Sequence, residues 1–130
     1  MIEVTTTEKK YKLTKKEFVR FQLVNELVYI RRIHLLQSDI DLLVFLIIEG
    51  QSELNKFCDK VVKDMFPNIK LTEYPIKLQV IRNRIGKLVK INLVNKVNDK
   101  KKKIIFNTDI KILLHGNNML NIKYLSIEAN

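Results

Sequence analysis

The sequence contains few of the residues that form disulfides, bind structural zinc or interrupt helices. It has one cysteine, two prolines and three glycines among 130 residues. The single cysteine, Cys58, excludes an intrachain disulfide framework and every zinc site that needs several cysteines. The scarcity of glycine argues against glycine-rich phosphate-binding loops. Few helix breakers in a chain of this length favour a largely helical fold.

Long apolar segments are also absent. The most apolar run, residues 40–48, contains Asp41 and is far shorter than the roughly 20 residues that a membrane-spanning helix needs. The first residues lack the basic and apolar segments of a secretory signal. Together with the single cysteine, these features predict an intracellular protein with no membrane partner. We expect it in the cytoplasm of a bacterial or phage-infected cell, with a virion as the alternative location.

The chain nevertheless has enough apolar residues to form a domain without help from a cofactor. Hydrophobic residues make up 46% of the sequence, and the length is typical of one domain. A chain of this size buries roughly two-thirds of its unfolded surface, so it needs no disulfide or metal to fold. We therefore predict a single domain over residues 1–130, with no cofactor and no metal site.

The net charge of +10 is concentrated in one part of the chain. Residues 76–111 contain eleven basic and two acidic residues, whereas the other 94 residues contain 13 basic and 12 acidic ones. A localised positive field attracts polyanions and accelerates their encounter. The alternative interpretation is a merely solubilising surface, its lysines a product of codon bias in an AT-rich genome. A smaller basic patch contains Lys9, Lys10, Lys12, Lys15, Lys16 and Arg20.

The first predicted helix covers about residues 15–32. Thr14 and Glu17 have the spacing of a capping box, in which each side chain bonds the backbone near the other. Arg31 and Arg32 suit a helix C-terminus. Apolar residues occupy more than one face of this helix, so we expect it to have a wider apolar surface than a single core contact needs.

Two shorter helices are predicted next. Residues 39–49, with Ser38 as the N-cap, are apolar almost all round, which is typical of a central buried helix. Gly50 follows as the residue that ends it. A buried strand is the alternative for this segment. Residues 53–66, with Ser52 as the cap, form the third helix. Its apolar stripe includes Cys58, which predicts a buried, inert thiol rather than a nucleophile.

The fourth predicted helix covers residues 75–91, after a connecting loop over residues 67–74. Pro75 suits a first helical position. At 100° per residue, one face of this helix is apolar and the opposite face is polar and basic. The opposite face carries Gln79, Val80, Asn83, Lys87 and Lys90, with Arg82 and Arg84 on the flanks.

The remaining segments read as strands and turns. Residues 93–97 and 102–106 predict a β-hairpin with its turn at residues 98–100. Residues 1–13 predict an N-terminal arm or short strand. Residues 108–130 predict a C-terminal β extension, because apolar and polar residues alternate after a turn at residues 115–118.

Three helices, a longer fourth helix and a hairpin with a lysine-rich tip resemble a winged helix-turn-helix domain. The most specific stretch, VIRNRIGKLVKINLV over residues 80–94, is similar to the recognition helix and first wing strand of many bacterial and phage regulators. KKKIIFN over residues 101–107 is similar to the returning wing strand. The resemblance covers residues 38–107. It implies a mainly α fold of about four helices plus two or three short strands, with residues 14–107 as the winged-helix core.

Two features depart from a tight helix-turn-helix. The link from Phe66 to Pro75 is longer than the usual turn of three or four residues. Gly86 lies in the middle of the fourth helix, where glycine costs roughly 1 kcal/mol relative to alanine. This glycine either permits a close approach by another backbone or is simply tolerated.

The resemblance implies a non-enzymatic protein that binds double-stranded DNA, in the manner of a transcriptional regulator. The helix over residues 75–91 would enter the major groove, and the wing over residues 96–103 would lie on the phosphate backbone. The residues implied for base contacts are Gln79, Arg82 and Asn83. The residues implied for phosphate contacts are Lys77, Arg84, Lys87, Lys90, Lys100, Lys101, Lys102 and Lys103.

Catalysis has little support in the sequence. His34 and His115 have no partners at the spacings of zinc or nucleophile motifs. The competing hypothesis is a phage virion structural or adaptor protein that uses a winged-helix fold for contacts with other virion proteins, because a fold does not dictate a function. A homodimer through the helix over residues 15–32, or through the C-terminal strand, is a further expectation.

Overall fold

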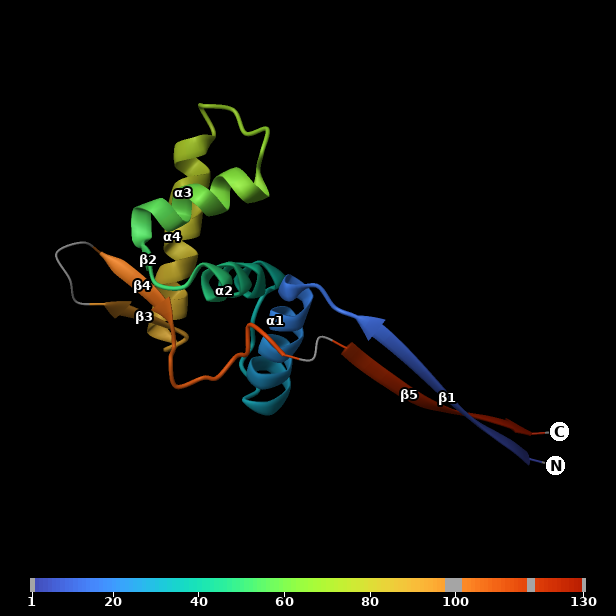
Figure 1. Cartoon of the computed structure of the whole chain (residues 1–130). Helices are drawn as coiled ribbons and strands as arrows, with labels where there is room; N and C mark the ends of the chain where they lie inside the picture. Colours follow the sequence, from blue (N-terminus) through green and yellow to red (C-terminus); the bar gives the residue numbers. More distant parts are fainter. Residues whose placement is uncertain (1, 98–101, 117–118, 130) are drawn as a thin grey trace.

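The chain folds into a helical body with a β structure projecting from each of two opposite sides (Figure 1). The computed structural model describes residues 2–97, 102–116 and 119–129. In chain order the elements are β1 (Ile2–Lys12), α1 (Lys15–Leu23), the π-helix η1 (Val24–Ile30), α2 (Gln37–Glu49), β2 (Ser52–Glu53), α3 (Leu54–Met65), α4 (Tyr74–Lys90), β3 (Val94–Val97), β4 (Lys103–Phe106) and β5 (Met119–Ala129).

The strands form two separate antiparallel sheets. One sheet has three short strands in the order β2–β4–β3, and the other is a two-stranded ribbon of β1 and β5. The predicted set of four helices and a β-hairpin is confirmed. The ribbon adds two strands of 11 residues each, so the fold is mixed α/β rather than mainly α.

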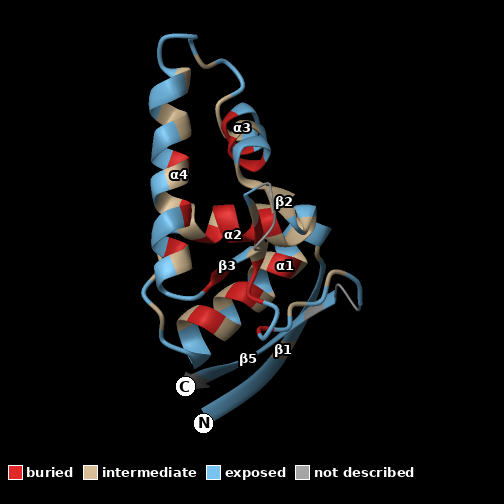
Figure 2. Ribbon diagram, turned by 90° about the vertical axis from the view of Figure 1, so that its left-hand side faces the viewer, coloured by how far each residue is buried: buried red, intermediate tan, exposed pale blue. Residues whose placement is uncertain are grey.

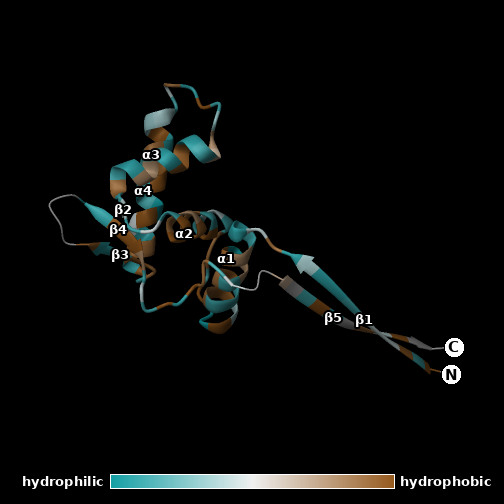
Figure 3. Cartoon of the chain, in the orientation of Figure 1, coloured by the Kyte–Doolittle hydropathy of each residue, from teal (hydrophilic) through white to brown (hydrophobic). Residues whose placement is uncertain are grey.

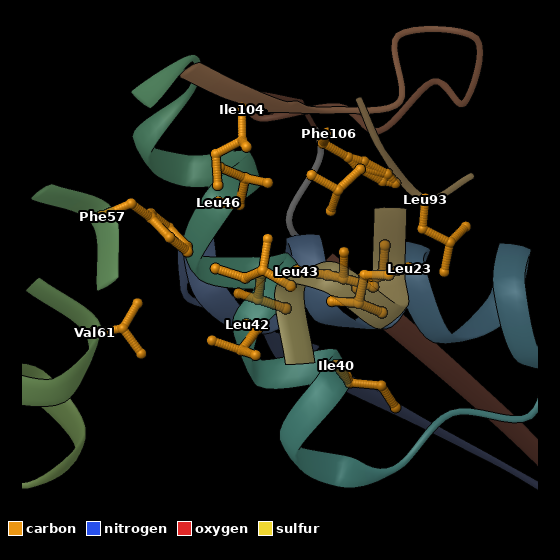
Figure 4. Close-up of a cluster of buried hydrophobic side chains, with 14 of the residues drawn as sticks. Leu23, Ile40, Leu42, Leu43, Leu46, Phe57, Val61, Leu93, Ile104 and Phe106 are labelled. Carbon is orange, nitrogen blue, oxygen red and sulfur yellow. The ribbon is translucent and has the colours of Figure 1, made fainter. Parts of the chain in front are cut away.

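Helix α2 is the centre of the core, as its all-round apolar sequence predicts. It contacts α1, α3, α4 and β4, and it is predominantly apolar along its length (Figure 3). Leu43 of α2 is fully buried, and burial of one leucine contributes about 1.5–3 kcal/mol. Figure 4 shows the side chains that meet around α2, which include Leu23, Leu42, Leu46, Phe57, Val61, Ile104 and Phe106.

The N-terminus of α2 differs from the prediction. The helix begins at Gln37 with Leu36 as its N-cap residue, so Ser38 lies inside the first turn and is not the cap. A carboxylate oxygen of Asp39 accepts a hydrogen bond of 3.1 Å from the backbone N–H of Leu36. The acid in the first turn therefore satisfies the backbone N–H of the N-cap residue, which is the role of the third helical residue in a capping box. Gly50 ends the helix as predicted, with a φ of 77° that favours glycine.

The predicted cap of the third helix is also wrong. Ser52 belongs to β2, where it pairs with Ile104 of β4, and its hydroxyl donates to the carbonyl of Gly50 at 2.9 Å. Helix α3 starts only at Leu54, whose backbone N–H bonds the carbonyl of Lys102 at 2.8 Å. Pairing with a strand that follows 50 residues later in the chain outweighs the local preference of serine for a cap.

The first helix begins as predicted but changes geometry half-way. Glu17 N–H bonds the Thr14 hydroxyl at 3.2 Å, and Thr14 N–H bonds the Glu17 carboxylate at 3.0 Å, which is the expected capping box. These bonds lower the pKa of Glu17. From Val24 the chain continues as a π-helix to Ile30. The prediction of one continuous α-helix to residue 32 therefore differs from the structure in two ways. The helical segment ends two residues earlier, at Ile30, and its second half is a π-helix, which is wider than an α-helix.

The hairpin after α4 is confirmed in position, and the structure gives its register. Val94 pairs with Phe106 and Val97 with Lys103. A backbone turn with Asn92 at φ 64° leads from α4 into β3, and the side-chain amide of Asn107 donates to the Asn92 carbonyl at 2.7 Å. The predicted turn at residues 98–100 lies outside the described residues.

The N-terminal arm and the C-terminal extension are partners. All of β1 pairs with β5, from Ile2 opposite Ala129 to Lys12 opposite Met119. The C-terminal strand is thus confirmed. Of the two alternatives for the N-terminal segment, an arm or a short strand, the structure shows the strand, which at 11 residues is longer than expected. The two strands are joined through the whole helical body, so no local pattern in the sequence indicated that they pair.

Candidate nucleic-acid interface

Helix α4 presents one side to the body and the other to solvent (Figure 2). Its 17 residues include five basic and no acidic side chains. Ile81, Ile85 and Leu88 are buried against the body, and Tyr74 at its first turn donates a hydrogen bond to the carboxylate of Asp59 in α3. This contact lowers the pKa of Asp59 and raises that of Tyr74. The helix is therefore held firmly while its outer face stays exposed.

The exposed face of α4 carries both amides that were predicted to read bases. Gln79 and Asn83 are exposed and lie one turn apart, with Gln79 Nε2 donating to Asn83 Oδ1 at 2.9 Å. An amide group has two N–H donors and a carbonyl acceptor, so this bond leaves each side chain with further bonding capacity. The structure brings these two residues together, as the helical spacing predicts.

Gly86 lies on the same exposed face. A Cβ atom at this position would have no described atom within 4 Å, so packing within the described chain does not require a glycine here. The absence of a side chain leaves a low point on the outer surface of the helix. Exposed Lys87 and Lys90 follow it toward the C-terminal end.

Arg82 is placed differently from a base-reading residue. It is half-buried on one flank of α4, and its Nη2 donates to Asn55 Oδ1 of α3 at 2.8 Å. The expected base contact therefore requires Arg82 to leave a partner in its own chain. Sequence analysis missed Asn55, because no local pattern shows which residue of α3 faces α4.

The other flank of α4 also has basic side chains that contact the body. Arg84 is half-buried, with Nη1 4.0 Å from Asp39 Oδ1 of α2. Lys77 Nζ lies 4.8 Å from the ring centroid of Phe66, a distance suited to a cation–π contact. Among the phosphate-binding residues predicted on α4, Lys87 and Lys90 are thus the two on the open face.

The hairpin contributes further basic residues beside α4. The chain reaches β3 three residues after α4 ends, and the two elements are in contact. Lys96 of β3 and Lys102 before β4 are exposed, and Lys103 is half-buried. Lys100 and Lys101 lie outside the described residues. Lys96 is not among the residues implied for phosphate contacts, although it is exposed, as Lys87, Lys90 and Lys102 are.

Neither Cys58 nor the pocket beside Arg20 and Asp41 extends this surface. Cys58 has no exposed area in the core, and burial raises the pKa of its thiol to about 11. A pocket of about 270 Å³ lies between α1, α2 and the end of α3, next to the ion pair of Arg20 and Asp41. Within the described ranges, no three His, Cys, Asp or Glu side chains are grouped to hold a metal ion.

Comparisons of the chain with known protein families, with curated proteins and with solved structures found no match. In the part of the chain that the structure describes, no helix is both long and apolar enough to span a membrane. The function is therefore argued from the geometry of α4 and the hairpin.

Proposed function

We propose that the protein is a non-enzymatic, regulator-like, double-stranded DNA-binding protein in which residues 37–106 form a winged helix. The order helix, strand, helix, helix, strand, strand supports this fold, since α4 runs directly into a hairpin whose second strand also pairs with β2. The long link over residues 66–73 is a departure that this fold accommodates on the outside of the body.

In this proposal α4 lies in the major groove, a cleft about 12 Å wide that admits one helix. Gln79 and Asn83 face the base edges, where an amide pairs well with adenine. Lys87 and Lys90 contact phosphates on one side of the groove, and Lys96 and Lys102 follow the backbone beyond it. Gly86 allows the DNA backbone to approach the helix closely.

The two arginines of α4 have a supporting role in this arrangement. Arg82 bonds α3 through Asn55, and Arg84 faces the acid at the start of α2. Both contacts fix the rotation of α4 about its own axis, so they determine which residues face outward.

The observation that carries the proposal is the charge and exposure of α4. A surface-exposed helix with five basic and no acidic residues beside a lysine-bearing hairpin creates a strong local positive field, because no carboxylate of the helix neutralises it. Such a field is the electrostatic signature of a nucleic-acid interface.

The direct test is binding to a labelled DNA duplex, measured by fluorescence anisotropy at about 50 mM salt, where phosphate contacts are strong. The Lys87→Glu/Lys90→Glu variant is expected to bind at least about tenfold more weakly than the wild type. The matched control is Lys15→Glu/Lys111→Glu, which makes the same charge change at exposed residues outside α4 and the hairpin. Equal weakening by both variants, or no binding by the wild type, would contradict the proposal.

The β1–β5 ribbon favours a second proposal, a virion structural or adaptor protein. The ribbon projects from the body on the side away from the β3–β4 hairpin (Figure 1), and several of its apolar side chains are exposed. A projecting apolar element is suited to contact with another protein. Absence of duplex binding in the experiment above would favour this function over the first.

A further inference from the structure

A small pocket lies where the start of α2, the end of α3 and one flank of α4 meet. Its volume is about 120 Å³, which is the space that about four water molecules occupy in the liquid. The lining residues are Ser38 and Leu42 of α2, Met65 and Phe66 at the end of α3, and Lys77, Val80, Ile81 and Arg84 of α4. The exposed amides and lysines proposed to face DNA are not among them, so the pocket is a separate feature of the molecule.

Much of the wall of this pocket is apolar. Leu42 is 2% exposed and Ile81 is 5% exposed, so the core of the protein supplies part of the wall. Met65 and Phe66 are half-buried beside them. Such a wall favours an apolar group over water, by about fourfold in affinity for each methylene group that is buried.

The pocket also has three polar side chains that can donate hydrogen bonds, Ser38 of α2 and Lys77 and Arg84 of α4. All three are half-buried. Within the described residues, the Ser38 hydroxyl and the Lys77 ammonium have no hydrogen-bond acceptor, and the ammonium lies 4.8 Å from the centroid of the Phe66 ring. Half-buried donors that lack an acceptor favour a ligand that supplies one.

Arg84 is only partly neutralised by its acidic neighbour. Asp39 Oδ1 lies 4.0 Å from Arg84 Nη1, beyond the range of about 2.7–3.2 Å for an N–H···O hydrogen bond. Nη1 is buried and bonds no described residue, whereas the side chain as a whole is 32% exposed and lines the pocket. The other Asp39 oxygen already accepts from the backbone N–H of Leu36. Two cations, Lys77 and Arg84, beside one carboxylate leave the site with an excess of one positive charge.

We propose that this pocket binds a small monocarboxylate that carries a short apolar body. The carboxylate accepts a hydrogen bond from the Ser38 hydroxyl and pairs with Lys77 and Arg84, while the apolar body lies against Leu42 and Ile81. A single negative charge matches the excess charge of the site. A phosphate group carries a charge of about −1.5 to −2 at pH 7 and offers no apolar surface to the wall.

The volume of the pocket limits the ligand to roughly four to six non-hydrogen atoms, so n-butyrate is a suitable probe. For a ligand of this size a dissociation constant of the order of 1 mM is expected. The site is independent of the proposed DNA binding, because it depends only on the packing of α2, α3 and α4. Failure of one proposal therefore leaves the other standing.

The test is titration of the full chain with n-butyrate at constant ionic strength, followed by chemical-shift changes in amide NMR spectra. The wild type is expected to show saturable shifts. Arg84→Gln is expected to bind at least about tenfold more weakly, because it removes a charge-assisted hydrogen bond. The matched control is Lys87→Gln, which removes one positive charge from the exposed face of the same helix and is expected to keep the wild-type affinity.

A second variant covers the case in which Arg84→Gln loosens the fold, which circular dichroism melting detects. Ser38→Ala removes only a hydroxyl group and is expected to weaken butyrate binding by about two- to tenfold. Two further probes separate charge from shape. n-Butylamine has a similar body and the opposite charge and is expected not to bind, and acetate, which has two methylene groups fewer, is expected to bind roughly tenfold more weakly than butyrate.

Four results would each overturn the inference. The first is the absence of saturable shifts with the wild type at about 50 mM butyrate, far above the expected dissociation constant. The second is equal weakening by Arg84→Gln and Lys87→Gln, and the third is binding of n-butylamine as tight as that of butyrate. The fourth is tighter binding of inorganic phosphate than of butyrate, which would show a site for any anion without a role for the apolar wall.

Discussion

The buried thiol of Cys58 makes the protein less stable at alkaline pH. Its side chain has no exposed area, and desolvation raises its pKa from 9.0 to about 11, while the positive charge of Arg82 opposes part of that rise. In the unfolded chain the thiol ionises near pH 9.0. Between these pKa values the folded state holds a proton that the unfolded state has lost, so the free energy of unfolding falls as pH rises.

The size of the effect follows from the two pKa values of Cys58. They differ by about 2, which corresponds to roughly 3 kcal/mol at 1.36 kcal/mol for each pKa unit. The contribution is fully present below pH 9.0 and is lost as pH rises through about 11. At pH 11 roughly 2 kcal/mol of it is already gone, because the folded thiol is then half ionised.

The assay is urea denaturation at pH 8, 9, 10 and 11, followed by circular dichroism, on the wild type and the Cys58→Ala variant. Lysine and tyrosine residues also titrate in this range, but they do so in both proteins and cancel in the difference. The stability advantage of the wild type over the variant is expected to shrink by about 2 kcal/mol between pH 8 and pH 11. A constant difference across this range would refute the reasoning, since it would show that the site does not resist ionisation.

Three further predictions concern the core, acid stability and DNA affinity. Phe57→Ala should lower the free energy of unfolding by about 3–5 kcal/mol in urea denaturation, because Phe57 is 1% exposed and its ring meets that of Phe45 edge-on at 5.5 Å. Tyr74→Phe should destabilise the protein at pH 6, and this destabilisation should shrink as pH falls from the ordinary Asp59 pKa of 3.8 through its lowered pKa in the folded protein, since the hydrogen bond stabilises the fold through the charged carboxylate. Lys87→Gln should reduce the slope of log affinity against log salt in duplex titrations by about 1.

Each of these three predictions has a result that contradicts it. A loss below about 1 kcal/mol for Phe57→Ala would mean that the site collapses around the missing ring or is less buried than described. If the free energies of unfolding of Tyr74→Phe and the wild type differed by the same amount at pH 6 and pH 3, ionisation of Asp59 would have no role. An unchanged salt slope for Lys87→Gln, with Lys15→Gln as the control, would place Lys87 away from phosphate.

Features that depend on neighbours within one or two helical turns were predicted well from the sequence. The capping box of Thr14 and Glu17 and the glycine end at Gly50 are both present. The two faces of α4 are also as predicted, with Gln79 and Asn83 exposed. In each case the residues that interact are at most four positions apart, so their spacing alone sets their geometry.

Most of the wrong predictions concern residues whose structure is set by contacts with segments far away in the sequence. Ser52 has the chemistry of a helix cap, but β4 pairs with it and makes it part of a strand. The π-helix covers only the seven residues Val24–Ile30. So short a segment contains too few apolar residues to show a period different from that of an α-helix. The link between β1 and β5 joins residues more than 100 positions apart at Ile2 and Ala129.

The sequence by itself determined that a basic, two-faced helix is followed by a lysine-bearing hairpin, because helical and strand periodicities and charge are local properties. Only the tertiary structure decided which basic residues remain on the open face. Arg82 and Arg84 lie against α3 and α2 because of the way these helices pack against α4. Helical periodicity predicts that a side chain on the flank of a helix contacts a neighbouring element. Only the relative placement of the helices shows which residue it contacts.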